Sequence, residues 1–309
     1  MSLRYAGCTV IIVSACGPWD QGRSHPIHEG TNTMIKVRIF VFSMIFTACF
    51  YAQAQASDES VWKQYFAWYQ EGDSHLNTPQ KYYAKLIADG MSETQADERM
   101  ELLKKLSAQH QADFVALYFD RMYTAPVAPF NTEPNAFLVN MTTNLKPGTA
   151  LDVEMGQGRN TLYLASKGWN ATGFDIAEKG LDVARAEAAK RKLHINAVKS
   201  TYEDFDFGHQ QWDLIVFSYA WVPLSDPALV ERVRAALKPN GVVMIEHPAE
   251  APSMSAAQNG TSRNPTDEIN ALVNVWTTGF RILRYEDTED QWDWRIRKAR
   301  VLRLFAQKW

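Results

Sequence analysis

Apolar and polar positions follow two different periodicities along the chain, and the change comes near residue 136. Before that point, apolar residues recur three and four positions apart, as they do on one face of an α-helix. After it, short apolar runs alternate with helix-like stretches, which is typical of strands connected by helices. The pattern predicts a helical segment over residues 57–135 and an α/β domain over residues 136–309.

The helical segment carries an aromatic stripe and clear start and stop signals. Thr78–Pro79 places a capping residue before a proline at the first helical position, and Gly90 ends that helix. Ser92 and Gln95 form a capping box that opens a helix running to about Tyr123. The aromatic stripe consists of Trp62, Tyr65, Phe66 and Tyr69.

The later helix of this segment has its own apolar face, made of Met100, Leu103, Leu106, Phe114 and Leu117. Such stripes usually pack against a neighbouring element. The alternative is that this helical segment covers a substrate pocket, because pockets often form where domains meet.

In the α/β domain, apolar runs predict strands and the stretches between them predict helices. The predicted strands are 149–153, 171–174, 195–199, 212–217, 242–246, 280–286 and 299–306. The predicted helices are 160–167, 178–192, 226–237 and 266–277. The last two strands have no helical pattern between them, so an antiparallel hairpin should end an otherwise parallel sheet.

The N-terminal part of the chain resembles a targeting segment. Residues 34–56 contain a short basic stretch, the apolar run Ile39–Phe50 and small residues near Ala54 and Ala56, which predicts a signal peptide or retained anchor. Residues 1–33 are interpreted as a non-native upstream extension, with translation beginning at Met34. A working leader predicts an exported protein, periplasmic or secreted, and otherwise the protein is cytoplasmic. A buried or peripheral helix over 35–50 is the alternative.

Composition removes several classes of function. All three cysteines precede residue 57, which excludes thiolate metal sites and cysteine nucleophiles from the rest of the chain. With 32 basic and 35 acidic residues, the charge balance gives no footprint for nucleic acid. No histidine pair has metal-ligand spacing, and no apolar run is long enough for a conventional transmembrane helix, so membrane contact is expected only through an uncleaved leader. The oligomeric state stays open.

The candidate chemistry lies at the first two predicted strands. Asp152 lies near the end of the first strand, Gly156 and Gly158 form the next turn, and Asp175 closes the second strand. Glycines allow a ligand to approach the backbone closely, and the second carboxylate can accept both hydroxyls of a ribose. The spacing fits one β-α-β unit and suits an adenosine ligand.

Residues Leu151–Ala165 and Lys167–Asp175 resemble the first two motifs of the class I S-adenosylmethionine (SAM)-dependent methyltransferases. Trp212–Val216 resembles the fourth strand of that family, and Leu237–Val243 resembles the turn into its fifth strand. The closing hairpin over 280–306 resembles the family's reversed last strand. The resemblance implies a Rossmann-like, seven-stranded, mostly parallel sheet with a terminal antiparallel hairpin. It also implies SAM as cofactor and methyl transfer to a small-molecule acceptor.

The resemblance assigns roles to the residues of these two motifs. Asp152 would orient the turn near the methionine amino group, and Gly156 and Gly158 would face the cofactor. Asp175 would hold the ribose, with Ile176 against the adenine.

A looser match concerns the adenine edge. Tyr202 and Glu203 follow the third strand and would contact that edge, although Thr201 and Asp204 are almost as well placed.

The residues after the later strands give candidates for the reacting end of the site. Ser218 and Tyr219 would line the methyl-transfer site by the same resemblance. His247, with Glu246, follows the fifth strand at the ligand-binding end of the sheet and is a candidate general base. A histidine held in a loop by hydrogen bonds is the alternative, because methyl transfer often needs positioning more than a base.

Glu154 departs from the family pattern, which has glycine at this position. Glutamate adds bulk and negative charge beside a carboxylate-bearing ligand, yet it could pair with the cofactor's amino group. Glu154 is therefore included among the cofactor-binding residues, and a noncatalytic exported binding protein on the same fold is the alternative function. A nicotinamide-dependent dehydrogenase is a third option, but its third motif glycine is missing.

Overall fold

A computed structural model describes residues 4–5, 8–9, 58–71, 77–126, 130–248, 265–291 and 298–309. The predicted leader over 34–56 lies outside these ranges and stays a prediction. The short strands β1 (Arg4–Tyr5) and β2 (Cys8–Thr9) pair antiparallel. In the described ranges, no helix has both the length and the apolarity that a membrane span requires. The chain divides into two units, residues 1–65 and 66–309.

A helix covers residues 58–70, and its part in the first unit buries Trp62 and Tyr65. The second unit begins with α2 (Pro79–Ala88), whose cap Thr78 accepts a hydrogen bond from the Lys81 N–H. The predicted capping box is confirmed at the start of α3 (Glu93–Gln109). In this unit, the rings of Phe66 and Tyr69 lie 5.6 and 5.1 Å from the ring of Phe114, so this part of the aromatic stripe serves packing.

The prediction of one helix ending near Tyr123 is wrong, because the helix breaks at His110. This residue has φ −108° and ψ 31° and separates α3 from α4 (Gln111–Tyr123). Its N–H donates to the Leu106 carbonyl, while its own carbonyl accepts from the Asp113 N–H. The break gives α4 a direction independent of α3. On the predicted apolar face, Leu103 and Leu106 are buried, and Met100, Phe114 and Leu117 are half-buried.

The α/β part contains every predicted strand and helix. Its elements are α5 (Ala136–Thr142), β3 (Thr149–Val153), α6 (Arg159–Ser166), β4 (Asn170–Asp175), α7 (Glu178–Arg191), β5 (Ile195–Lys199), β6 (Trp212–Ser218), α8 (Pro227–Ala236), β7 (Leu237–Pro248), α10 (Pro265–Trp276), β8 (Phe280–Gln291) and β9 (Lys298–Lys308). The sheet order is β5-β4-β3-β6-β7-β9-β8. The five strands β5, β4, β3, β6 and β7 are parallel. β9 pairs antiparallel with both β7 and β8. The predicted Rossmann-like sheet with a terminal hairpin is confirmed.

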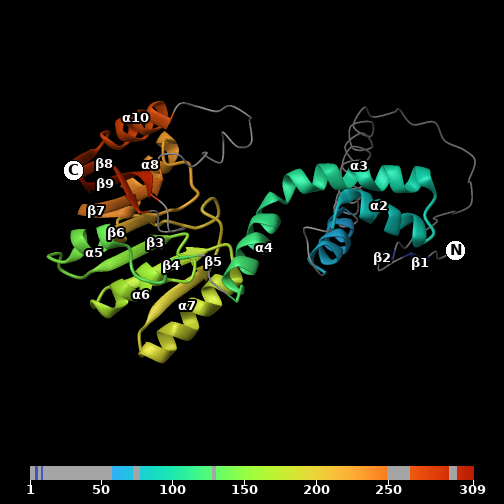
Figure 1. Cartoon of the computed structure of the whole chain (residues 1–309), viewed down its shortest axis with the longest axis horizontal. Coiled ribbons are helices and arrows are strands. Elements are labelled where there is room, and N and C mark those ends of the chain that lie inside the picture. Colours follow the sequence, from blue (N-terminus) through green and yellow to red (C-terminus); the bar gives the residue numbers. More distant parts are fainter. Residues whose placement is uncertain are drawn as a thin grey trace, which may run out of the picture. The chain divides into compact units, whose positions relative to one another are not determined.

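Helices cover both faces of this sheet (Figure 1). One face packs Leu151, Ile215 and Val243 against residues of α8 and α10, and Trp276 of α10 is fully buried there. The other face packs Ala150 and its neighbours against α5 and α6. Successive residues of each strand thus enter opposite layers, so both faces are buried.

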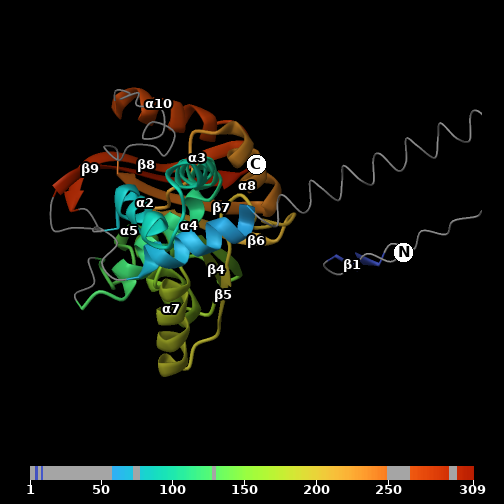
Figure 2. The same cartoon turned by 90° about the vertical axis from the view of Figure 1, so that its right-hand side faces the viewer.

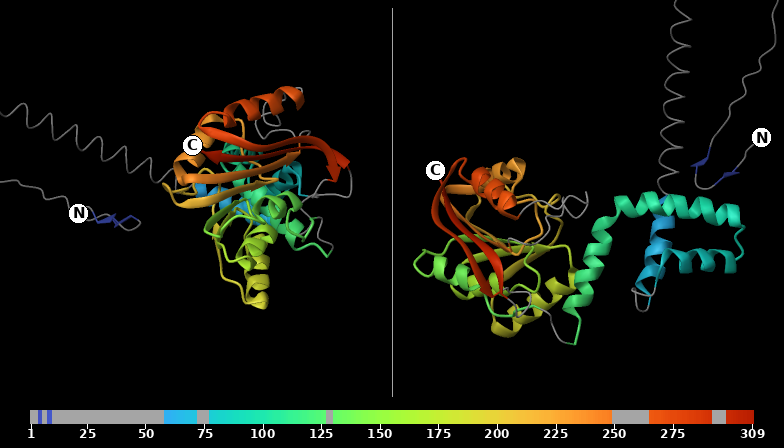
Figure 3. Two further views of the ribbon diagram at one scale, coloured as in Figure 1. Left: turned by 90° about the vertical axis from the view of Figure 1, so that its left-hand side faces the viewer. Right: turned by 45° about the horizontal axis from the view of Figure 1, so that its top comes forward.

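The closing hairpin is longer than its apolar pattern predicts (Figures 2 and 3). β8 continues past Glu286 to Gln291 and remains paired with β9. Ion pairs join the extended part of the two strands, including Arg300 with Asp287 at 2.7 Å and Arg303 with Asp290 at 2.6 Å. Cross-strand charge pairs stabilise such polar strands, and the hydrophobic pattern does not indicate them.

Candidate active site

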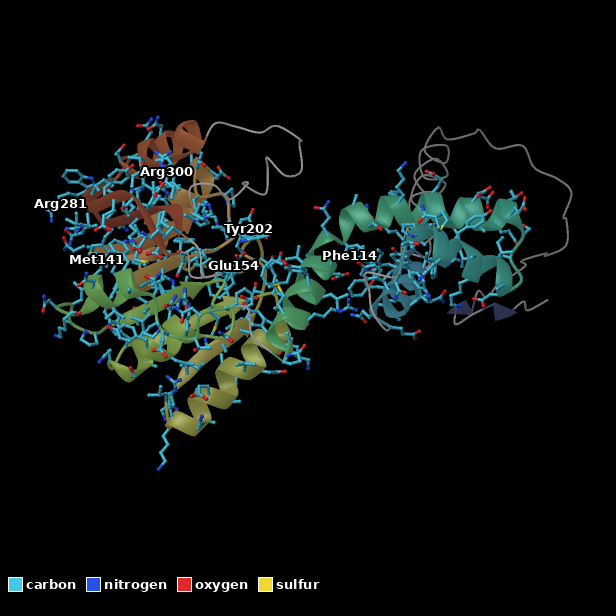
Figure 4. All side chains as sticks on the ribbon, viewed as in Figure 1. Phe114, Met141, Glu154, Tyr202, Arg281 and Arg300 are labelled. Carbon is cyan, nitrogen blue, oxygen red and sulfur yellow. The ribbon has the colours of Figure 1, made fainter. Side chains whose placement is uncertain are left out.

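A pocket of about 260 Å³ lies where β3, β4, β5 and β6 end, at the carboxyl edge of the sheet. Ligands bind at this edge in open α/β sheets. Eight predicted site residues line the pocket: Asp152, Glu154, Gly156, Asp175, Ile176, Tyr202, Glu203 and Ser218. Tyr219 and Thr201 line it as well, whereas Asp204 does not. Figure 4 shows Glu154 and Tyr202 close together on this side of the sheet.

Asp152 fixes the turn that follows β3. Its Oδ2 accepts hydrogen bonds from the backbone N–H of Thr161 at 3.1 Å and from the Thr161 hydroxyl at 2.7 Å. Thr161 belongs to the first turn of α6, so the carboxyl ties the end of the strand to the start of the helix. Burial raises the pKa of Asp152 to about 6, although the bonds from Thr161 oppose the shift.

The two glycines of the turn have different surroundings. Gly156 has φ +56°, and a Cβ there would lie 2.3 Å from the hydroxyl of Tyr123 on α4. Gly158 has φ +78°, and a Cβ there would lie 2.7 Å from the Cβ of Ala184 on α7. Gly156 therefore lies at the pocket, whereas Gly158 permits close packing of α6 and α7. Gly158, predicted to face the cofactor, is not a lining residue.

Asp175 closes β4 and lies beside the glycine turn. Its Oδ2 accepts from the Gly156 N–H at 2.8 Å, and its Oδ1 accepts from the Ala177 N–H at 2.8 Å. Burial raises the pKa of Asp175 to about 6, and these backbone donors limit the rise. The carboxyl is thus held rigidly at the pocket wall, and each of its oxygens keeps a lone pair that a ligand hydroxyl can use.

Glu154 follows β3 directly and adopts φ +54°, which is in the left-handed region. Its Oε2 accepts a hydrogen bond of 2.5 Å from the backbone N–H of Trp221, a residue that follows β6. Burial, together with repulsion from Asp175, raises the pKa of Glu154 to about 8. The residue is partly exposed, yet its carboxyl lies inside the pocket wall, where solvation is poor.

The charges lining the pocket are mainly negative. Its described lining contains four carboxyl groups and one guanidinium, that of Arg159. Arg159 begins α6, and its guanidinium donates to the Glu133 carbonyl at 3.0 Å and to the Ser218 hydroxyl at 3.4 Å. A ligand that suits this lining carries positive charge with one anionic group near Arg159.

One wall of the pocket is aromatic, and the sequence pattern did not predict that its residues belong to the site. Phe119 and Tyr123 of α4, Phe130 and Trp221 all line the pocket. The Phe119 ring is 5.8 Å from that of Trp221, and the Tyr123 ring is 5.1 Å from that of Phe130. The apolar face that the sequence predicted for this helix, which includes Phe114, packs instead against the rings of Phe66 and Tyr69. The spacing of Phe119 and Tyr123 at i and i+4 is the available signal for a second apolar face.

His247 does not line the pocket. It pairs with Leu302 across β7 and β9, and within the described ranges its Nδ1 has no hydrogen-bond partner. Burial lowers the pKa of His247 to about 4, so the imidazole is neutral and weakly basic at pH 7. Its predicted role as a general base gains no support from this position.

Glu246 belongs to a buried polar network behind the pocket. Its Oε1 accepts from the Asn135 side chain at 2.7 Å, and its Oε2 accepts from Arg303 at 2.7 Å. The Asn135 backbone N–H in turn donates to the side chain of Asn160, a pocket residue. Glu246 therefore supports the pocket wall and is itself not exposed to it.

The edge of the sheet that contains the pocket lies in a segment that is similar to known proteins. Residues 150–241 match the protein family described as "Methyltransferase domain". The matched segment runs from β3 into β7 and contains most of the pocket residues named above.

Curated proteins similar to this chain carry methyltransferase names. The ubiquinone biosynthesis O-methyltransferase of Actinobacillus pleuropneumoniae is 33% identical over 99 residues, which is 30% of this chain and 42% of the relative. An uncharacterized methyltransferase of Synechocystis sp. is 32% identical over 107 residues, covering 32% of this chain and 46% of the relative. The chain thus spans less than half the length of both relatives.

Solved methyltransferase structures are also similar to this chain. One SAM-dependent methyltransferase from Methanosarcina mazei is 18% identical, with a TM-score of 0.45, and the match covers 57% of this chain and 98% of that one.

Proposed function

We propose that the chain is a SAM-dependent methyltransferase that acts on a small-molecule acceptor. The main support for this proposal is the position of Asp175. Its carboxyl is held rigidly at the end of β4, beside the glycine turn that follows β3. Both groups lie in one pocket within the segment similar to methyltransferase domains. This pairing suits a ribose hydroxyl pair with the rest of an adenosine nearby.

The lining residues fit SAM by charge. SAM carries a sulfonium, an ammonium and a carboxylate, and the pocket offers four carboxyl groups and one guanidinium. Asp175 would hold the ribose, Ile176 and Tyr202 would contact the adenine, and Arg159 would face the carboxylate. When bound, SAM supplies an electrophilic methyl group. The chain's residues then contribute alignment and exclusion of water.

The aromatic wall supports an acceptor of small size with an apolar part. Phe119, Phe130 and Trp221 present ring surface to the same pocket that contains Ser218 and Tyr219. Rings of this kind bury apolar surface and stack with planar groups. An acceptor held between these rings and the end of β6 would be shielded from bulk water.

A noncatalytic binding protein is the second candidate, and Glu154 is the observation that favours it. Its side chain stands at a position where a glycine would leave more room for ligand. Such a protein would bind an adenosine compound without transferring a methyl group.

A methyl-transfer assay separates these candidates. The full chain is incubated with methyl-labelled SAM and a mixture of cellular small molecules, alongside Asp175→Ala and the distant control Asp182→Ala on the exposed side of α7. We expect labelled small molecules with the native chain and the control, and none with Asp175→Ala. Label confined to macromolecules would contradict the small-molecule acceptor, and SAM binding without any transfer would favour the second candidate.

A further inference from the structure

Glu154 combines two unfavourable features that its packing does not explain. A non-glycine residue in the left-handed region is strained, and φ is +54° here. Its carboxyl also lies in a poorly solvated wall beside Asp175, another carboxyl. Strain and buried charge of this kind cluster at functional sites, so the side chain is a candidate for direct ligand contact.

Among the residues that the structure describes, Glu154 has a neutral hydrogen-bond donor and no cationic partner. Throughout the described ranges, no lysine, arginine or histidine forms an ion pair with Glu154. The Trp221 N–H, which holds Oε2, is a neutral donor. Because a buried carboxylate is stabilised best by an opposite charge, the missing partner is a positive group of a ligand in the pocket.

The sheet register places Glu154 at a defined point relative to Asp175. Val153 pairs with Phe174, so the residues that follow them, Glu154 and Asp175, are level on adjacent strands. Neighbouring strands lie about 4.8 Å apart. Ile176 and Tyr202 line the same pocket, and Tyr202 follows β5, which lies on the opposite side of β4 from β3. A nucleoside with its ribose on Asp175 and its base toward β5 therefore directs its 5′ substituent toward Glu154.

In SAM that 5′ substituent is the sulfonium. Building on the proposed function, we propose that Glu154 recognises the positive charge of the donor's sulfonium and thereby distinguishes SAM from its product S-adenosylhomocysteine (SAH). SAH keeps the ammonium and the carboxylate but has a neutral thioether. A site that interacts with the sulfonium charge binds SAM more tightly than SAH. Release of the product SAH therefore becomes easier.

Paired titrations test this assignment. The affinities of SAM and SAH are measured by calorimetry for the full native chain, Glu154→Gln and the control Glu187→Gln, which lies on α7 outside the pocket lining. We expect native binding to favour SAM by about tenfold, the lower end of the range for one close pair of opposite charges. Glu154→Gln should bring the ratio near one while SAH affinity changes less than about twofold, and Glu187→Gln should keep the native ratio.

The outcomes separate this inference from the proposed function. Equal weakening of SAM and SAH in Glu154→Gln would overturn it, because that result indicates contact with a group shared by both ligands. A native ratio near one would also overturn it. A native chain that binds neither compound would refute the proposed function and the inference together. Far-ultraviolet circular dichroism and a thermal melt establish that each variant is folded.

Discussion

Replacing Glu154 by glutamine should stabilise the ligand-free protein, and the gain should grow with pH. The native carboxyl has a pKa of about 8 in the folded chain, against 4.5 for an ordinary glutamate. A raised folded pKa means that its protonated form favours folding. This contribution is complete below pH 4.5 and is lost as the pH rises through about 8. Glutamine keeps the shape of the side chain and does not ionise.

The magnitude follows from the size of the shift. Each pH unit between the two pKa values changes the free energy of unfolding by about 1.4 kcal/mol. At pH 7 the native glutamate therefore costs about 3 kcal/mol relative to its neutral form, and above pH 8 the cost levels at about 5 kcal/mol. Glutamine should remove most of this cost while retaining a hydrogen bond with the Trp221 N–H.

Urea unfolding of both proteins without ligand, at several pH values from about 4 to about 9, measures the difference directly. The matched control is Glu187→Gln, because Arg191 holds the pKa of that exposed carboxyl below its usual range. Its substitution should therefore change stability in the opposite direction. A Glu154→Gln difference that does not vary with pH, or that becomes more destabilising as pH rises, would show that the Glu154 carboxyl is not held in its neutral form by the folded chain.

Further expectations concern the turn, the polar network, the donor and the leader. Gly158→Ala should lower the free energy of unfolding by about 1–3 kcal/mol in urea titrations, because the new methyl would crowd Ala184 at positive φ. Glu246→Ala should cost about 3 kcal/mol by the same measurement, since it leaves the buried Asn135 amide without its acceptor and removes the most buried of the carboxylates that pair with Arg303, whereas a cost below about 1 kcal/mol would show that the network is unimportant. Calorimetry should show SAM affinity rising relative to SAH affinity as pH approaches about 8, because only the ionised Glu154 pairs with a cation, and a constant ratio would contradict this. If the leader is cleaved, mass spectrometry of the protein purified from its native host should find an N-terminus at Gln55 or Ser57, and an intact Met1 would disprove the leader prediction.

The sheet could be predicted because the apolar pattern of each strand and the turn residues between the elements indicate the same fold. The strand around Leu151 is apolar apart from its first residue and the site residue Asp152, as expected for a strand buried on both faces, and Gly156 and Gly158 mark the turn into the next helix. The capping signals at Thr78 and Ser92 also predict real helix starts. These features depend on a few neighbouring residues, which is why the sequence alone contains them.

Other features depend on contacts between distant parts of the chain. The break at His110 involves neither glycine nor proline, so no local signal indicated it. The pocket roles of Phe119 and Trp221 arise from the packing of α4 beside the end of β6. The distinct roles of Gly156 and Gly158 required the positions of Tyr123 and Ala184, which lie on other helices. The family resemblance placed both glycines at the cofactor.

Calorimetric titration of the full chain with SAM, with Asp175→Ala measured in parallel, tests the proposed SAM site most directly. We expect one SAM bound per chain with a dissociation constant on the order of micromolar, a common range for enzyme ligands. Asp175→Ala should lose at least about tenfold in affinity, since a buried ribose contact is removed. A native chain that shows no heat of binding, or an Asp175→Ala variant with native affinity, would contradict the proposed SAM site at the ends of β3 and β4.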